Sequence, residues 1–351
     1  MGIPLLGMTT EGLRTLLQKE GAQAYRGSQV SEWLYRRGAR EFAHMTNLPE
    51  ALRSHLSQSY LIGRSSVAAV QRSKDGTVKL LLQMQDGAKV ETVGLPYPDR
   101  MSCCVSTQVG CPIGCVFCAT GSSGYSRNLT AGEIVDQVLS VQQSGQEPTG
   151  TGSERERRVD HVIFMGMGEP LLNHEATVKA IELLNEELGI AMRQLTVSTV
   201  GFVPGIRRLA REKPQFTLAV SLHAPTDDLR RRLIPRMTAW SVAEIVDACR
   251  DFVRNTGRRV TFEYCLLEGV NAGQTQAKEL AVLLRGLNCH VNLIAYNAVT
   301  GLGFRAPSRA QIASFRSILE EAGIAVTQRL ERGSDIDAAC GQLRRRIADE
   351  G

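Results

Sequence analysis

The spacing of apolar and polar residues along the chain changes after Pro96. Stretches with apolar residues at helical spacing alternate with short apolar stretches rich in β-branched residues, and this alternation predicts parallel β-α-β units. The predicted strands are Cys103–Ser106, His161–Met165, Leu195–Thr199, Thr217–Leu222, Val260–Leu266, His290–Tyr296 and Ala325–Leu330. The predicted helices are Thr130–Gln143, His174–Leu188, Gly205–Arg211, Val242–Arg254, Gln274–Arg285 and Ser308–Ala322.

About six such units predict an α/β fold with a partial or full β/α barrel, and the pattern alone does not distinguish six units from eight. Active sites of such barrels lie at the carboxyl ends of the strands, so polar residues at those ends are candidates for function. The polar insert Gly145–Arg158 lies at the opposite end by the same logic, and we expect it to be a mobile loop.

The first part of the chain has a different pattern. Helical periodicity over Thr9–Lys19, Gly27–Arg37 and Leu48–Tyr60 predicts a small helical module. The segments Thr77–Leu82 and Ala88–Val93 flank an Asp-Gly pair, which predicts a β-hairpin. We therefore expect a helical accessory domain over residues 1–70, a β-hairpin extension over 71–96 and the β/α core over 97–351.

Composition narrows the class of protein. The 351 residues carry a net charge of +5, which alone does not indicate nucleic acid binding. No apolar run reaches the roughly 18 residues of a membrane span, and the N-terminus lacks the features of a signal peptide. We therefore expect a cytoplasmic protein without membrane contact. In that compartment thiols stay reduced, so nine cysteines favour metal or redox chemistry over a disulfide scaffold.

Arginines form four clusters, which fit either solvated helix faces or phosphate contacts. They are Arg207–Arg211, Arg230–Arg232 with Arg236, Arg258–Arg259 and Arg344–Arg346.

Three cysteines follow the first predicted strand in the segment Cys111-Pro-Ile-Gly-Cys115-Val-Phe-Cys118. A structural zinc site needs four protein ligands, and each iron of a [4Fe–4S] cluster is normally held by one cysteine. Three local thiolates therefore predict a cluster with one open iron, where a substrate or cofactor can bind. The alternatives are a zinc site with a distant fourth ligand and three unrelated buried cysteines.

The spacing C-x3-C-x2-C resembles the signature of the radical S-adenosylmethionine (SAM) superfamily. Several further segments resemble the RlmN/Cfr group of rRNA methyltransferases, and the resemblance spans nearly the whole chain. The segments are Cys104-Val-Ser-Thr-Gln-Val-Gly-Cys111, Cys118-Ala-Thr-Gly, Arg127-Asn-Leu-Thr, Phe164-Met-Gly-Met-Gly-Glu-Pro170 and Asp335-Ile-Asp-Ala-Ala-Cys340-Gly-Gln-Leu343.

The resemblance implies a partial (β/α)6-type radical SAM barrel, one [4Fe–4S] cluster on Cys111, Cys115 and Cys118, and SAM on the open iron. Polar residues at four successive strand ends fit a SAM pocket, although each alone is typical of a turn or a helix cap. By resemblance the SAM pocket is formed by Gly168, Glu169, Ser198, Ser221, Leu222, His223 and Asn297.

The resemblance also implies an unusual methyl transfer. One SAM methylates Cys340, and a second SAM yields a 5′-deoxyadenosyl radical that takes a hydrogen from this methyl group. The methylene radical adds to an adenine carbon, Glu91 accepts the proton, and Cys104 displaces the thioether as a disulfide. Alone, Glu91 is typical of a solvated strand residue, and Cys104 and Cys340 of buried cysteines. We expect Cys249 and Cys265 in the core and assign no role to Cys103 or Cys289.

The implied substrates are adenine 2503 of 23S rRNA and adenine 37 of tRNAs, both at carbon C2. Methylation at C8, the Cfr-type reaction, is the alternative, but the Cfr type has alanine where Pro170 stands. An electron donor such as flavodoxin or ferredoxin is implied, and we favour a monomer. Candidate phosphate contacts in the helical module are Arg26, Arg36, Arg37 and Arg40.

Two other classes of function compete. Another radical SAM reaction is one, but methylthiolation would need a second three-cysteine set, which the sequence lacks, and an activase would not need Cys104 and Cys340. A non-catalytic, zinc-bound RNA-binding protein is the other, and it predicts zinc instead of iron and sulfide.

Overall fold

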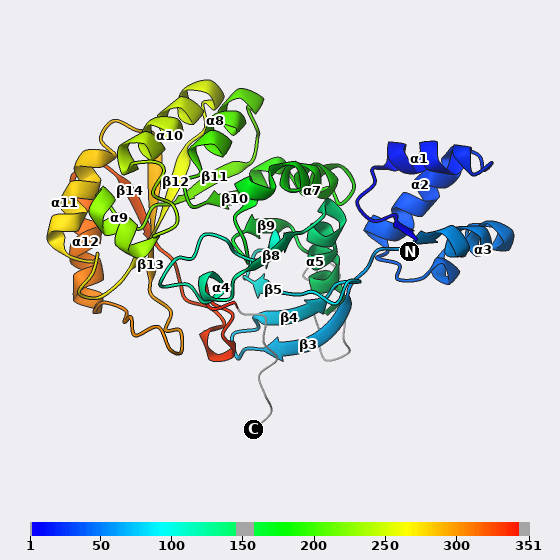
Figure 1. Cartoon of the computed structure of the whole chain (residues 1–351), viewed down its shortest axis with the longest axis horizontal. Coiled ribbons are helices and arrows are strands. Elements are labelled where there is room, and N and C mark those ends of the chain that lie inside the picture. The colour runs from blue at the N-terminus through cyan, green and yellow to red at the C-terminus, as the bar shows by residue number, and fades with distance from the viewer. Residues whose placement is uncertain (1, 145–157, 344–351) are drawn as a thin grey trace.

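The computed structural model describes residues 2–144 and 158–343, and a ten-stranded sheet lies at its centre (Figure 1). The strand order is β14-β13-β12-β11-β10-β9-β6-β5-β4-β3. Most of the predicted loop Gly145–Arg158 and the cluster Arg344–Arg346 lie outside the described residues. Within the described part of the chain, no helix is long and apolar enough to cross a membrane.

Seven strands of the sheet are parallel, and they follow one another in space as they do in the sequence. Such a sheet winds in one direction, as in a β/α barrel, whereas a doubly wound sheet reverses its order. Strands β14 and β3 lie at its two edges, so the barrel is partial and the fold prediction is confirmed. The seven are β6 (Met101–Cys104), β9 (His161–Phe164), β10 (Leu195–Thr199), β11 (Thr217–Ser221), β12 (Val260–Leu266), β13 (Cys289–Ala295) and β14 (Ala325–Gln328).

Helices cover the outer side of these strands (Figure 1). Helix α10 shows how local sequence sets their ends. The Ser241 hydroxyl accepts a hydrogen bond from the Glu244 backbone N–H at its start, and Gly257 ends the helix in the left-handed conformation. The covering helices are α5 (Ala131–Ser144), α7 (His174–Glu186), α8 (Val203–Glu212), α10 (Val242–Thr256), α11 (Gln274–Leu283) and α12 (Arg309–Glu321).

Three antiparallel strands extend the sheet beyond β6. The predicted hairpin is present as β4 (Val78–Gln83) and β5 (Lys89–Pro96), and β5 pairs with β6. Strand β3 (Ser66–Arg72) was not predicted. Its side chains are mostly exposed at the sheet edge, so it lacks the buried face on which a strand prediction depends.

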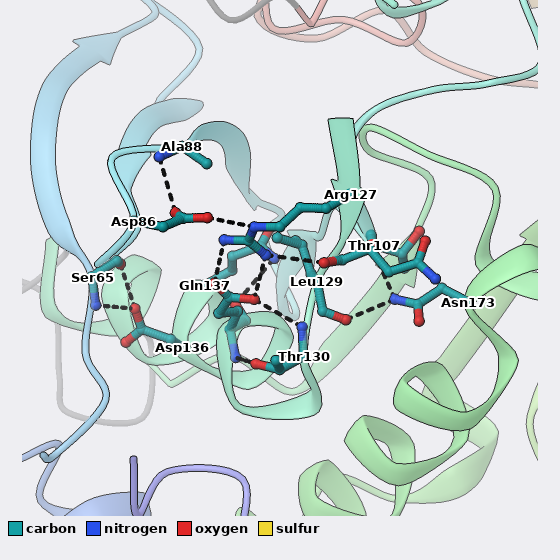
Figure 2. A network of polar contacts seen from close by, with 12 residues as sticks. Ser65, Asp86, Ala88, Thr107, Arg127, Leu129, Thr130, Asp136, Gln137 and Asn173 are labelled. Carbon is teal, nitrogen blue, oxygen red and sulfur yellow. Dashed lines mark hydrogen bonds and ion pairs between the residues drawn. The ribbon is translucent and has the colours of Figure 1, made fainter. Parts of the chain in front are cut away.

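A polar network fastens the tip of this hairpin to the core (Figure 2). Arg127 lies on β8 (Tyr125–Asn128), which pairs with β7 (Gln108–Gly110). Its Nε donates to Asp86 Oδ2 at 2.6 Å, and its Nη1 and Nη2 bind the Glu133 carboxylate at 2.9 and 2.7 Å. The arginine thus joins the hairpin turn to the first turn of α5.

The N-terminal helices form a module at one side of the sheet (Figure 1). Apolar residues of the module belong to the same hydrophobic cluster as the sheet, and polar contacts add to this, because the Glu187 carboxylate after α7 accepts hydrogen bonds from Thr10 and Ser31 at 2.7 to 2.8 Å. The expected domain boundaries stay a prediction. The module contains α1 (Thr10–Lys19), α2 (Tyr25–Ser31) with a π-helical turn (Glu32–Arg36), α3 (Glu50–Ser59) and the short parallel strands β1 (Ile3–Pro4) and β2 (Tyr60–Leu61).

Two hydrophobic clusters pack the protein. The larger one lies between the sheet and its helices and continues into the N-terminal module. The smaller one lies against the cysteine loop and the short helices α4 (Ala119–Ser122) and α9 (Asp227–Leu233). Its buried members include Ile113, Phe117, Leu229, Leu233 and Tyr296. This second cluster is what fixes the cysteine loop near the strand ends.

Candidate active site

A tight loop carries the three motif cysteines from β7 to α4. Gly110 precedes it with φ +81°, and a Cβ atom there would lie 1.8 Å from the Gly124 carbonyl oxygen, so only glycine fits. The Cys111 backbone N–H donates to that same carbonyl at 3.0 Å, and the Cys118 N–H donates to the Cys115 carbonyl at 3.2 Å. The loop therefore curls back on itself and presents its side chains together.

Cys111, Cys115 and Cys118 line one cavity, whose empty volume is about 970 Å³, part of it open to solvent. The cavity lies at the carboxyl ends of β9, β10 and β11, as expected for a barrel. It brings the cysteines together with five of the seven predicted SAM residues, namely Gly168, Glu169, Ser198, Ser221 and His223.

The other two predicted SAM residues lie elsewhere. Asn297 lines an adjoining cavity with an empty volume of about 760 Å³, and its Nδ2 donates to the Cys340 carbonyl at 3.1 Å. The Leu222 side chain is fully buried and lines neither cavity. Its backbone carbonyl accepts a hydrogen bond from Arg230, so a contribution of Leu222 through its backbone stays a prediction.

Glu169 is a buried carboxyl group at the start of a 3-10 turn. Its two oxygens accept hydrogen bonds from the backbone N–H groups of Val200 at 2.7 Å and Leu171 at 3.0 Å. Burial raises the pKa of Glu169 to about 7, because these hydrogen bonds offset only part of the desolvation of the charged form. A bound cationic group, such as an amino group, would favour its ionised form.

His223 has a constrained position beside the cysteine loop. It has φ +59°, in the left-handed region, and its ring contacts Phe117 edge-on at 5.0 Å between centroids. Its Nδ1 accepts a hydrogen bond from the Cys265 backbone N–H at 3.0 Å, so in the neutral ring the proton is on Nε2. Burial, and then the charge of Arg230, lower the pKa of His223 to about 3, so the ring is neutral at pH 7.

Cys104 and Cys340 line the same adjoining cavity, although the sequence separates them widely. Two hydrogen bonds hold the Cys340 segment against α4: the Ala119 N–H donates to the Gly341 carbonyl at 2.8 Å, and the Thr120 hydroxyl donates to the Leu343 carbonyl at 2.9 Å. In Figure 1 this segment, in red, lies beside α4. Cys118 and Cys340 belong to the walls of both cavities, so the two spaces meet at these thiols.

Glu91 does not share a cavity with the motif cysteines or with Cys104 and Cys340. It is 2 % exposed and lines neither cavity, and its Oε1 lies 3.3 Å from Lys79 Nζ on the neighbouring strand. Its backbone carbonyl accepts a hydrogen bond from Ser106, whose hydroxyl in turn accepts one from the Met167 N–H. It is thus a buried, ion-paired group rather than a solvated strand residue, and its catalytic role stays a prediction.

The remaining cysteines are all buried. Cys249 lies in the larger hydrophobic cluster and Cys265 in the smaller one, as predicted for both, and Cys265 also lines the larger cavity. Cys103 and Cys289 are in the core and line neither cavity.

Sequence reasoning missed three charged residues near the thiols. Arg329 lines both cavities, and the charge of Cys340 is the main influence that raises the pKa of its guanidinium. It directly follows β14, so the strand-end rule could have found it. Glu263 also lines the larger cavity, but it lies within β12, where sequence gives no sign of function. The third, Arg230, was grouped with surface arginines.

The donor set fits a cluster better than a single ion. No group of three or more His, Cys, Asp or Glu side chains within residues 2–144 and 158–343 is arranged around one metal ion. Ligands of a four-iron cube stand farther apart than those of a single ion, and here three thiols share one cavity. Burial raises the pKa of Cys111 to about 12, and that of Cys115 also rises, so bound cations would be needed to keep these thiols ionised.

The four candidate arginines of the N-terminal module fall into two kinds. Arg36 donates to the Leu188 carbonyl and Arg40 to the Ser65 carbonyl, so both join the module to other segments. Arg26 and Arg37 instead stack on the rings of Tyr25 and Trp33, at 4.7 and 4.5 Å from the centroids. Arg26 also donates to the Asn47 carbonyl and Arg37 pairs with Glu32, so phosphate binding by these arginines stays a prediction.

Comparison with known families gives two matches. The family profile described as "Radical SAM superfamily" matches residues 105–280, which includes the three cysteines. The profile described as "Ribosomal RNA large subunit methyltransferase N-terminal domain" matches residues 3–62.

Several curated proteins are similar over almost their whole length. A protein of Gloeobacter violaceus named "Probable dual-specificity RNA methyltransferase RlmN" is 51% identical, covering 99% of this chain and 96% of that protein. A protein of the same name from Thermosynechococcus vestitus is 48% identical, covering 97% of this chain and 98% of that protein. Among solved structures, a radical SAM methyltransferase from Sphaerobacter thermophilus superposes with a TM-score of 0.93 at 45% identity, covering 98% of this chain and 100% of that chain.

Proposed function

The chain belongs to the RlmN family of radical SAM RNA methyltransferases, and from this premise we propose that it methylates carbon C2 of adenine 2503 in 23S rRNA and of adenine 37 in tRNAs. The observation that carries the proposal is that Cys104 and Cys340 share a cavity that meets the cavity of the three motif cysteines. That arrangement is what a cysteine methyl carrier and its displacing thiol require.

The target carbon explains why a carrier is needed. Carbon C2 of adenine lies between two ring nitrogens and is electron-poor, so it cannot attack a SAM methyl group as a nucleophile. Cys111, Cys115 and Cys118 would hold one [4Fe–4S] cluster, which together with SAM supplies the methyl group and the radical chemistry. The chain itself must then hold the methyl group, orient the adenine and release the product.

Cys340 would carry the methyl group as a thioether. Its segment is fixed by the bonds to Ala119 and Thr120, and the Cys340 carbonyl is held by Asn297, so its position relative to α4 is set. The Cys104 thiolate would attack the Cys340 sulfur and form an S–S bond, while the electron pair of the breaking S–C bond passes to the transferred carbon, which takes up a proton to complete the methyl group. Arg329 lies at the wall shared by both cavities, where its charge favours thiolate forms.

The proton of the adenine carbon needs an acceptor, and we assign this to Glu91. The carboxylate is paired with Lys79 and stands outside both cavities, whereas the Glu91 backbone carbonyl is linked through the Ser106 hydroxyl to the Met167 N–H in the loop that holds Gly168. The assignment therefore requires that RNA binding bring the base and this carboxylate together.

Five strand-end residues would bind SAM. Glu169 would pair with the amino group, and the backbone at Gly168 can approach a ligand because that position has φ +104° and no Cβ. The Ser198 and Ser221 hydroxyls lie 3.3 Å apart and face the cavity, where they can bind polar groups of the ligand. The neutral His223 offers a donor at Nε2.

RNA contacts and cellular context complete the proposal. The target base must leave its stack to reach Cys340, and the arginine–aromatic pairs of the N-terminal module would bind the RNA nearby. We further propose a cytoplasmic monomer that receives electrons from a flavodoxin or ferredoxin.

The first experiment identifies the methylated nucleoside. Anaerobically reconstituted protein is incubated with SAM, a reductant and an unmodified 23S rRNA fragment, and the digested RNA is analysed by mass spectrometry. We expect 2-methyladenosine, and none from Cys340→Ala. A product of 8-methyladenosine would place the chain with the Cfr type, and a normal yield from Cys340→Ala would refute the carrier role.

A second arm replaces the rRNA fragment with unmodified tRNA. Methylation of adenine 37 at C2 would support dual specificity, and methylation of the rRNA fragment alone would remove tRNA from the proposal.

A further inference from the structure

Arg230 is a buried cation at the edge of the candidate SAM pocket. It lies in α9 and is 2 % exposed, although its neighbours Arg231 and Arg232 in the same cluster are exposed. The Arg230 guanidinium donates to the carbonyls of Val200 and Leu222, and to that of Ser221 at 3.3 Å. These carbonyls belong to the ends of β10 and β11, so one side chain ties together the two strands that carry Ser198, Ser221 and His223.

The positive charge has no direct counter-ion. Within the described residues no carboxylate lies at ion-pair distance from Arg230, and its buried Nε has no hydrogen-bond partner. The nearby Asp227 carboxylate is engaged elsewhere, because it accepts a hydrogen bond from the Val242 N–H at 2.6 Å. A buried guanidinium that meets only carbonyl dipoles is costly, so the charge calls for a negative group close by.

The cysteine loop is packed against α9, so a negatively charged cluster held there would lie close to Arg230. Helix α9 is bonded directly to the loop, since the Val116 N–H donates to the Leu233 carbonyl at 3.0 Å. Of the ionisable groups around Arg230, the Cys115 thiol exerts the strongest influence on it, ahead of Asp227 and Glu169. Burial lowers the pKa of Arg230 only to about 10, so it remains a cation at neutral pH.

We propose that Arg230 is the buried counter-charge of the cluster that Cys111, Cys115 and Cys118 would hold, and the clamp that aligns β10 and β11 for SAM. The inference rests on the proposed cofactor but not on the identity of the RNA. Adding an electron to the cluster adds negative charge, and a nearby cation makes this easier. Arg230 is therefore a positioning residue that also raises the reduction potential of the cluster.

Two variants of the reconstituted holoenzyme, measured without RNA, separate the effect of the Arg230 charge from that of its side-chain shape. Arg230→Gln can still donate to carbonyls but has no charge, and Arg230→Lys keeps the charge but loses the planar fork. The midpoint potential is measured by redox titration monitored by electron paramagnetic resonance, and SAM binding by equilibrium dialysis. Arg231→Gln is the matched control, because Arg231 is the next residue of α9, is exposed and pairs with Asp228.

We expect Arg230→Gln to shift the reduction equilibrium about tenfold toward the oxidised cluster, which is about 59 mV for one electron. Arg230→Lys should change it less than twofold while raising the SAM dissociation constant several-fold, and Arg231→Gln should change neither. If Arg230→Gln protein with a complete cluster had the wild-type reduction potential, the proposed role of Arg230 as counter-charge would be refuted.

If Arg230→Gln takes up no iron and sulfide, Arg230→Lys decides the question. Restored uptake by the lysine variant supports the proposal, and failure of uptake in that variant contradicts it. Because no RNA is present, an incorrect RNA substrate would leave all of these results unchanged. Zinc in place of iron and sulfide in the wild-type protein would instead refute the cofactor of the proposed function.

Discussion

Glu169 and Cys104 show how burial sets chemistry at the scale of single residues. The Glu169 carboxyl group ordinarily titrates near 4.5 and is raised to about 7, and burial also raises the pKa of the Cys104 thiol. Both groups are therefore neutral over a wider pH range in the folded chain than in the unfolded one, and a cationic partner nearby would favour the charged form of each.

Glu169 makes the stability of the cluster-free protein depend on pH. Between pH 4.5 and 7 the folded chain retains a proton that the unfolded chain has released, so this contribution to stability is complete below about 4.5 and is lost as pH rises through 7. We expect the free energy of unfolding of the wild type to fall by about 2 to 3 kcal/mol relative to Glu169→Gln between pH 5 and pH 8. Urea titrations of both proteins measure this difference, and parallel pH profiles would show that Glu169 does not titrate there.

Cys104 gives a prediction about product release. If its thiol displaces the thioether, Cys104→Ala should still join Cys340 to the adenine but should leave the RNA attached to the protein. A denaturing gel after anaerobic reaction should then show a covalent protein–RNA species and at least tenfold less free methylated RNA. Cys103→Ala is the matched control, because Cys103 is the adjacent buried cysteine and lines neither cavity. Free product at the wild-type rate from Cys104→Ala would remove this role.

Sequence could predict some site residues because their chemistry follows from spacing. The three motif cysteines and the polar residues after β9, β10 and β11 meet in one cavity, as the strand-end rule requires. Arg230 was not predictable, since burial of one arginine among three depends on how α9 packs against the cysteine loop. Likewise, no spacing rule places Glu91 relative to the cavities, because this depends on the strand pairing of β4 and β5.

At the scale of elements, the strands and helices with regular hydrophobic periodicity were predicted from the sequence. Strands β10 and β12 have the predicted bounds, and the other predicted strands and helices differ by a few residues at their ends. The missed elements β3, β7 and β8 are short or lie at edges, where hydrogen bonding to neighbours rather than a buried face defines the strand. Arg127 shows why β8 was not predicted from sequence, because its contacts to residues distant in sequence fix that strand.

Arg127→Met should weaken the attachment of the β4–β5 hairpin. The change removes hydrogen bonds to the carboxylates of Asp86 and Glu133 and leaves Glu133 partly buried without its partner. We expect the free energy of unfolding to fall by about 2 kcal/mol, with faster hydrogen exchange at the hairpin turn. Arg254→Met, which breaks an exposed pair with Asp251, should cost under about 0.5 kcal/mol. Equal losses in the two variants would show that the network contributes no special stability.

At the scale of the whole molecule, the N-terminal module shares a hydrophobic cluster with the sheet and is also joined to the core by several polar contacts. The Glu187 carboxylate accepts three hydrogen bonds from Thr10 and Ser31, and Arg36 reaches the Leu188 carbonyl beside it. The orientation of the module relative to the sheet therefore rests on these hydrogen bonds together with the shared hydrophobic cluster. The affinity for an RNA that contacts both parts would therefore depend on that orientation.

Glu187→Ala should loosen the module without changing the candidate SAM site. Loss of the three bonds should lower the free energy of unfolding by about 2 kcal/mol and speed proteolysis within the first sixty residues. Glu187→Gln retains an acceptor oxygen and should have about half this effect. RNA affinity should fall in Glu187→Ala, whereas SAM binding to the reconstituted protein should not, and a matching loss of SAM binding would show that the two parts are coupled.

The separation of Cys118 and Cys340 has a consequence for how the protein is made. At about 5 to 20 residues per second, a ribosome completes the three-cysteine loop roughly 10 to 45 s before it adds Cys340, more than two hundred positions later. During that interval Ala119 and Thr120 lack the carbonyls of Gly341 and Leu343 that later hold them. A nascent chain that acquired its cluster at this stage would hold it before Ser198, Ser221, Asn297 and Cys340 have been made, and so without the candidate SAM pocket or a methyl carrier. Loading of the cofactor should therefore follow translation rather than accompany it.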